Sequence, residues 1–131
     1  MLLVDTSVWV EVFRLRGPRL ESLVDFDEIV TCLPVIQEVL QGFDDERAFR
    51  IARDAMAALP IVESPLGPER FEEAAALYRA ARRAGVTVRS GVDCLIAACA
   101  IHNGLAVLHD DRDFDLLARV SPLDSRRLPS R

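Results

Sequence analysis

The chain of 131 residues contains no lysine, and all 16 of its basic residues are arginines. A P-loop, a Schiff-base enzyme and a Ser-Lys dyad each depend on a lysine, so these chemistries are excluded. Cysteine is also scarce, because Cys32, Cys94 and Cys99 are the only three and form no Cys-x-x-Cys pair. This odd number indicates neither a disulfide framework nor a zinc ribbon, and predicts small buried side chains.

The sequence also lacks a long hydrophobic run. No apolar stretch is long enough to cross a bilayer, and the segment Met1–Asp5 has too few apolar residues for a signal peptide. We therefore expect a cytoplasmic protein. Half of the residues are hydrophobic, which favours a folded domain over a disordered chain of net charge −5. The length predicts one domain over residues 1–131, with a polar tail from about 121 to 131.

Short apolar segments alternate with helical patterns along the chain. Strands are expected at 2–4, 28–32, 60–63 and 105–108, with a weak edge strand in the tail. Helices are expected at 7–16, 34–41, about 45–59, 69–84, 91–103 and 110–119, and Gly17–Pro18 breaks the first of them. Unbroken apolar strands indicate a parallel sheet covered on both faces. The predicted fold is a three-layer α/β/α domain with a central, mostly parallel sheet of four to five short strands.

Acidic residues follow the ends of the predicted strands. Asp5 comes directly after the first strand, and Asp110 and Asp111 follow the last apolar strand. Glu38 lies in the helix after the second strand, and Asp93 begins the helix that leads into the last inner strand. Because open parallel sheets bind ligands beyond the carboxyl ends of their strands, these side chains are expected to converge on one edge.

Each acidic residue also has a purely structural interpretation. Asp5 could cap the first helix, Ser90 and Asp93 match a common capping pattern, and Asp110 and Asp113 make a similar pair on the next helix. This interpretation weakens when the acids are taken together, since they all lie at the edge predicted to hold a ligand.

Carboxylates that lie close together repel each other, and this repulsion must be offset. Two of them about 6 Å apart repel by roughly 3 kcal/mol at an effective dielectric constant near 20. Divalent cations, a basic partner or protonation would relieve this repulsion. Oxygen ligands suit Mg²⁺ or Mn²⁺, whereas zinc prefers nearby histidine or cysteine. A metal held in this way lowers the pKa of a bound water and stabilises charge on a phosphodiester.

Four segments carry a family resemblance: Asp5–Trp9, Val35–Gly42, Asp93–Ala98 and His109–Asp115. They resemble the motifs of PIN-domain nucleases, and more narrowly those of the VapC toxins of VapBC toxin–antitoxin modules. Each motif is weak by itself, but the four occur in the right order in a chain of suitable length. The resemblance extends from residue 2 to about residue 119.

The resemblance implies an endoribonuclease dependent on Mg²⁺ or Mn²⁺, which forms a homodimer and is held inactive by a VapB-like antitoxin near its early helices. The implied acidic site consists of Asp5, Glu38, Asp93 and Asp111, with Asp113 as a fifth member. Ser7 matches the small polar residue that orients the first aspartate, and Asp110 lies outside the metal shell. In the implied mechanism Asp5, Asp93 and Asp111 hold the metal and Glu38 orients the attacking water. The products would carry a 5′-phosphate and a 3′-hydroxyl.

An acidic nuclease still needs cationic side chains to bind RNA. Arg79, Arg82, Arg83 and Arg89 bracket the end of the long helix and the loop that follows it, and are candidate phosphate contacts. They could equally be cations that stabilise the carboxyl end of a helix. Arg112 lies beside the acids and could bind RNA too, or pair with a neighbouring aspartate (Asp115).

Other functions remain open at this point. His102 and His109 could serve a metal-free ribonuclease, although packed or supporting positions are favoured for both. A PIN-type RNA-processing nuclease without an antitoxin would use the same acids, and a non-enzymatic module would use them to bind a basic peptide. The aromatic residues on helical stripes are predicted to be core or dimer contacts: Trp9, Phe13, Phe49 and Phe71.

Overall fold

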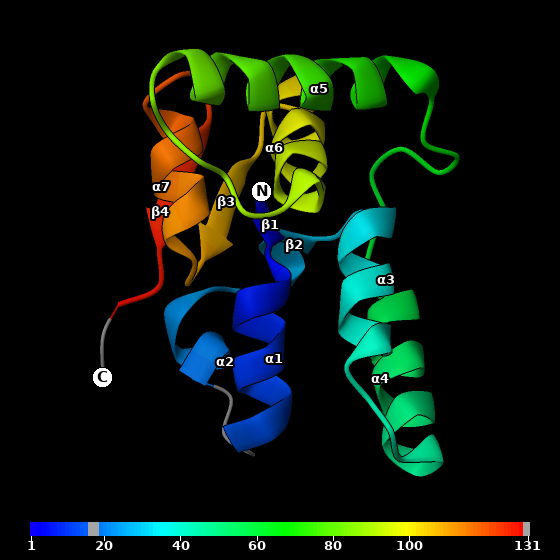
Figure 1. The fold of residues 1–131 in the computed structure, drawn as a ribbon. Coiled ribbons are helices and arrows are strands. Elements are labelled where there is room, and N and C mark those ends of the chain that lie inside the picture. Colours follow the sequence, from blue (N-terminus) through cyan, green and yellow to red (C-terminus); the bar gives the residue numbers. More distant parts are fainter. Residues whose placement is uncertain (16–18, 130–131) are drawn as a thin grey trace.

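The computed structural model describes residues 1–15 and 19–129, and its centre is a parallel sheet of four strands (Figure 1). In sequence order the strands are β1 (Leu2–Val4), β2 (Ile29–Val30), β3 (Ala106–His109) and β4 (Asp124–Arg127). Their spatial order is β2-β1-β3-β4, and every pairing is parallel. The central strands β1 and β3 are fully buried, which explains their apolar sequences. The predicted parallel sheet and the weak edge strand in the tail are confirmed.

The strand predicted at 60–63 is wrong. Only an isolated bridge between Thr31 and Ile61 forms there, with backbone hydrogen bonds of 2.9 Å on both sides of Thr31. At Glu63 the backbone φ is 56°, in the left-handed region, so the chain turns away before a ladder can extend.

Helices connect all the strands, and several begin at a local cap. Asp45, Ser90 and Asp111 each accept a hydrogen bond from a backbone N–H of the following turn. The predicted end of the first helix at Arg16 and its break at Gly17–Pro18 lie outside the described residues. The helices are α1 (Thr6–Leu15), α2 (Arg19–Leu23), the 3-10 helix η1 (Phe26–Glu28), α3 (Leu33–Gln41), α4 (Glu46–Ala57), α5 (Pro68–Arg83), α6 (Gly91–His102) and α7 (Arg112–Ala118).

The direction of the crossovers reverses between β1 and β3. The connection through α1 and α2 moves from β1 outward to β2, whereas α6 and α7 lead in the opposite direction, to β3 and then to β4. Right-handed crossovers then put α1 and α2 on one face of the sheet and α6 and α7 on the other. In Figure 1, α1 and α2 lie at the bottom, below the strands, α5 lies at the top, and α6 lies below α5, beside β1 and β3. The three-layer α/β/α expectation is confirmed, and the reversal point is where such sheets bind ligands.

The long helix α5 packs against α6 along one stripe of side chains. Ala74 and Ala81 are buried there, and the stripe starts at Arg70, whose guanidinium pairs with Glu63. Phe71 is 53% exposed, so its prediction as a core residue is wrong, because Arg70 takes the buried position next to it. A dimer contact at Phe71 stays a prediction.

The predictions for Trp9, Phe13 and the cysteines fit the core, whereas Phe49 is partly buried and does not belong to the core cluster. Trp9 is buried, and Phe13 packs partly buried against it, with ring centroids 6.1 Å apart. The three cysteines are buried and free, as predicted. Across residues 1–15 and 19–129, no helix combines the length and the hydrophobicity needed to traverse a lipid bilayer.

Candidate active site

Asp5 lies at the carboxyl end of β1, beside the reversal point. Its N–H donates to the carbonyl of Leu108 at 2.9 Å, which continues the pairing of β1 with β3 by one residue. Its carbonyl accepts the N–H of Val8 at 3.0 Å, so the same residue starts α1. The side chain is almost entirely buried, with the residue 2% exposed. The strand-to-helix junction therefore sets a carboxylate in the crevice where a ligand is expected.

Within residues 1–15 and 19–129, one oxygen of the Asp5 carboxylate takes part in hydrogen bonds. Its Oδ2 accepts the N–H of Ser7 at 3.0 Å and the Ser7 hydroxyl at 2.6 Å. The Ser7 Oγ in turn accepts the N–H of Asp110 at 2.9 Å, which connects this carboxylate to the end of β3. The Oδ1 of Asp5 is buried and has no partner within the described part of the chain. Helix capping thus accounts for one oxygen and leaves the other for a ligand.

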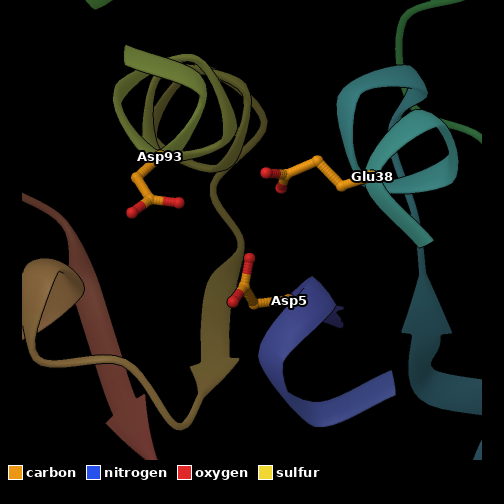
Figure 2. A group of neighbouring side chains, drawn as sticks. All are labelled: Asp5, Glu38 and Asp93. Carbon is orange, nitrogen blue, oxygen red and sulfur yellow. The ribbon is translucent and has the colours of Figure 1, made fainter. Parts of the chain in front are cut away.

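Glu38 reaches the same space from α3 (Figure 2). The hydroxyl of Thr6 donates to its Oε1 at 2.9 Å, across 32 positions of sequence. Sequence reasoning missed this role of Thr6, because its partner lies on another helix. The only available signal was the position of Thr6 between Asp5 and Ser7.

Asp93 points into the cluster from the first turn of α6 (Figure 2). The Ser90 hydroxyl caps this helix by accepting the N–H of Val92 at 3.2 Å. Asp93 is only 7% exposed, and its carboxylate faces those of Asp5 and Glu38. The capping pattern is therefore real for Ser90, but it does not explain the buried acid.

Asp111 and Asp113 complete the cluster at the start of α7. The helix is capped by Asp111, whose Oδ1 accepts the N–H of Asp113 at 3.0 Å, so the predicted capping role of Asp110 is wrong. Asp113 is 1% exposed and accepts the backbone N–H of Arg89 at 3.3 Å. The guanidinium of Arg89 also contacts Asp111 at 3.1 Å and Asp113 at 3.5 Å, which ties the loop before α6 to α7.

The carboxylates form two overlapping groups, Asp5 with Glu38 and Asp93, and Asp93 with Asp111 and Asp113. Within each group, one oxygen of every residue lies within 4.8 Å of the others. Neither group contains a histidine or cysteine among the residues that the structure describes, so the ligand set suits a hard divalent cation better than zinc. The unpartnered Oδ1 of Asp5 fits the same interpretation, since a buried carboxylate oxygen needs a donor or a cation.

Burial raises the pKa of Asp5, Glu38 and Asp93. Hydrogen bonds from Ser7 oppose this effect at Asp5, and the Thr6 hydroxyl opposes it at Glu38. At Asp93 the negative charges of the other acids add to burial, and its pKa rises to about 8. Two carboxylates 4.8 Å apart repel by roughly 3 kcal/mol at an effective dielectric constant near 20. At neutral pH the cluster therefore favours uptake of a proton or a cation.

The arginines proposed for RNA binding lie in three separate parts of the structure. Arg89 lies in the acidic cluster, with 70% of its side chain exposed. Arg112 is exposed at the start of α7, and Asp115 is instead bonded by Arg127 at 2.6 Å. Arg79, Arg82 and Arg83 line a surface hollow of about 340 Å³ at the end of α5.

The two histidines do not form a shared site. His102 lies at the end of α6, before β3, and approaches Arg70 at 3.2 Å. His109 lies at the opposite, carboxyl end of β3 and is fully buried, and burial lowers its pKa. The interpretation as a metal-free ribonuclease with two histidines therefore loses its structural basis.

A model of the PIN domain family matches residues 2–120 of the chain. Two relatives are the VapC ribonuclease Mb1587 of Mycobacterium bovis and the ribonuclease VapC11 of Mycobacterium tuberculosis. Each is 40% identical over 131 residues, which cover 95% of this chain and 97% of the relative.

Solved structures resemble the fold over nearly the whole chain. The DNA-bound VapBC from Salmonella typhimurium has a TM-score of 0.78 at 14% identity, with 96% of both chains covered. VapBC2 from Rickettsia felis, bound to a DNA fragment from the promoter, has a TM-score of 0.76 at 16% identity, with 98% of both chains covered. Because these sequence identities are low, the comparison with solved structures shows a similarity of fold.

The metal-free protein should lose stability as the pH rises, because of Asp93. Its pKa of about 8 in the folded state exceeds the value of about 3.9 for an unfolded aspartate, so the folded state binds the extra proton between these values. This contribution is fully present below about pH 4 and is lost as the pH rises through 8. Asp93→Asn should therefore raise the free energy of unfolding in EDTA at pH 8.5 by roughly 1–3 kcal/mol.

Thermal unfolding followed by circular dichroism at pH 5.5 and pH 8.5 measures this difference. Asp110→Asn is the matched control, because it removes the same charge from an exposed neighbour of the cluster. An equal gain in Asp110→Asn would assign the effect to net charge, and no gain in Asp93→Asn would contradict the electrostatic account.

Proposed function

The chain belongs to the PIN-domain family, and we propose that it is a metal-dependent endoribonuclease that acts as the toxin of a type II toxin–antitoxin pair. The observation that carries the chemistry is the convergence of acidic side chains from four separate segments at the reversal point of the sheet. The 40% identity to VapC ribonucleases supports RNA as the substrate. A toxin that cleaves the RNA of its own cell and is held by an antitoxin would act in the cytoplasm.

We propose Mg²⁺ or Mn²⁺ as the cation, held by Asp5, Asp93 and Asp111. Such a cation, when bound, lowers the pKa of water and offsets negative charge on a phosphodiester. Glu38 is held by Thr6 through one oxygen, so its other oxygen is available to orient an attacking water. Asp113, engaged by the backbone N–H of Arg89, holds the loop beside the cluster and takes the place of the fifth acid.

RNA would approach along a path marked by arginines. The exposed guanidinium of Arg89 lies directly at the carboxylates, and Arg112 is exposed on the neighbouring helix α7. The hollow lined by Arg79, Arg82 and Arg83 offers three further positive charges at the end of α5. Guanidinium groups bind phosphate oxygens bidentately, which suits a polyanion held against an acidic protein.

The partner would be a VapB-like antitoxin seated between α1 and α3. A cleft of about 220 Å³ lies there, lined among others by Val10, Phe13 and Phe43. Thr6 and Glu38 belong to the same two helices, so a segment in this cleft could extend to the acidic cluster. Basic side chains on that segment would neutralise the carboxylates and block the substrate.

Loss of one carboxylate should abolish cleavage. Asp5→Asn and Asp93→Asn should each lower the rate of RNA cleavage with Mg²⁺ by at least about 100-fold, because each removes a metal ligand. Asp110→Asn should stay within about twofold of wild type. The measurement is cleavage of total RNA in EDTA and after addition of Mg²⁺ or Mn²⁺, with cleavage sites mapped by primer extension.

Two outcomes of that measurement would contradict the proposal. Undiminished cleavage in EDTA would indicate a metal-free ribonuclease. A folded wild-type protein that cleaves no RNA with either cation would favour the non-enzymatic acidic module.

The products should carry a 5′-phosphate and a 3′-hydroxyl, because water and not the RNA 2′-hydroxyl attacks the phosphorus. An oligonucleotide with a single 2′-deoxy sugar on the 5′ side of the mapped cleavage site should still be cut, more slowly. Denaturing gels and mass spectrometry of the products test this. A 2′,3′-cyclic phosphate, together with complete resistance of the deoxy substrate, would exclude the hydrolytic route.

The hollow at the end of α5 should contribute to RNA affinity. Replacing Arg82 and Arg83 together by alanine should reduce the slope of log K against log salt concentration by about 0.7 for each phosphate that these side chains neutralise. Fluorescence anisotropy with an uncleaved RNA in Ca²⁺ or EDTA measures the slope. Replacing Arg50 and Arg53 of α4 by alanine removes the same charge elsewhere, and an equal change in that variant would make the effect non-specific.

A further inference from the structure

A chain of polar contacts runs from the outer strand β4 to the acidic cluster. The ring of His109, at the end of β3, is fully buried. Its Nδ1 accepts the backbone N–H of Asp111 at 3.2 Å, and its Nε2 lies 2.6 Å from the hydroxyl of Ser125. Ser125 donates to Asp115 Oδ1 at 3.3 Å, and Arg127 donates to Asp115 Oδ2 at 2.6 Å.

Only one assignment of protons satisfies all the hydrogen bonds in this series of contacts. Because a backbone N–H can only donate, the Nδ1 of His109 must be the unprotonated nitrogen of a neutral ring. The proton is then on Nε2 and is donated to Ser125, whose own proton goes to Asp115. Arg127 holds the carboxylate that ends the chain. Because the Asp115 carboxylate takes the Ser125 proton, the hydroxyl oxygen is left to accept from Nε2, which favours the histidine tautomer that can accept the Asp111 amide.

The contacts fix the loop between β3 and α7 from both of its ends. His109 precedes Asp111, and Asp115 follows it on α7, and both side chains are bonded to residues of β4. The carbonyl of His109 also accepts the N–H of Leu128 at 2.7 Å, so the strand anchors the backbone beside the loop. β4 contributes no carboxylate to the acidic cluster, yet its contacts help to determine where Asp111 lies.

We propose that Ser125 is a positioning residue for the metal site, acting through His109 on Asp111, with Arg127 and Asp115 as its support. The inference rests on the proposed function for the presence of a metal at Asp111. Loss of the Ser125 hydroxyl removes the acceptor 2.6 Å from Nε2 and leaves only Asp115 Oδ1, at 3.4 Å, beside it among the described residues. The weaker contact favours the Nε2-protonated ring less, so the ring can take the other tautomer, in which Nδ1 carries a proton and repels the Asp111 amide. Such outer contacts of metal ligands typically change metal affinity by about tenfold or more.

The test compares Ser125→Ala, Ser125→Thr and a matched control, Ser121→Ala. Ser121 lies in the same region and its hydroxyl donates to the carbonyl of Leu117 at 2.7 Å, apart from the histidine chain. Mn²⁺ affinity is measured by calorimetry on each folded variant, and thermal melting checks its folding. Long-range ¹H–¹⁵N spectra report the tautomer of His109 without any metal or substrate.

We expect Ser125→Ala to bind Mn²⁺ about tenfold more weakly and to show a mixture of His109 tautomers. Ser125→Thr, which keeps the hydroxyl, should restore both the affinity and the Nε2-protonated ring, and Ser121→Ala should match wild type. Unchanged affinity in Ser125→Ala, or equal weakening in Ser121→Ala, would overturn the inference. A wild-type protein that binds no Mn²⁺ would instead refute the proposed function, and the positioning role with it.

Discussion

Repulsion between carboxylates is the constraint on which the rest of this site depends. The strand order reverses between β1 and β3, and the reversal brings Asp5 and Asp111 to one crevice. Asp93 completes both acidic groups from the first turn of α6, and its pKa of about 8 reflects burial among like charges. A cluster of this kind is stable only with a proton or a cation, which makes it a trap for a metal ion.

The fold holds Asp5 and Glu38 each through one carboxylate oxygen and leaves the second oxygen to a ligand. The Ser7 hydroxyl and amide occupy one oxygen of Asp5, and the Thr6 hydroxyl occupies one oxygen of Glu38. These contacts pre-orient the carboxylates before any ligand arrives, so little conformational entropy is lost on binding. They also partly oppose the rise in pKa that burial causes, which keeps the acids closer to their ionised, metal-binding form.

Much of the fold could be predicted from the sequence, because hydrophobic periodicity and helix capping depend on residues only a few positions apart. Short apolar runs predicted the central strands. The acidic residues directly after those strands predicted that carboxylates would line the crevice. Ser90 was correctly predicted as a helix cap, since capping needs only the next turn. The pattern failed at 60–63, where an apolar segment makes one bridge only, and at Phe71, where Arg70 occupies the buried position. In both cases packing against distant elements decided the outcome.

By itself the sequence determined the fold class, the order of the elements and which acids stand near strand ends, since each depends on hydrophobic period and on neighbouring residues. Tertiary structure alone decided that Thr6 bonds Glu38 and that Arg89 contacts both Asp111 and Asp113. It alone linked β4 to the site through His109. These contacts join residues far apart in the chain. Local periodicity shows which side of an element is buried, but it does not encode which distant side chains meet in the folded protein.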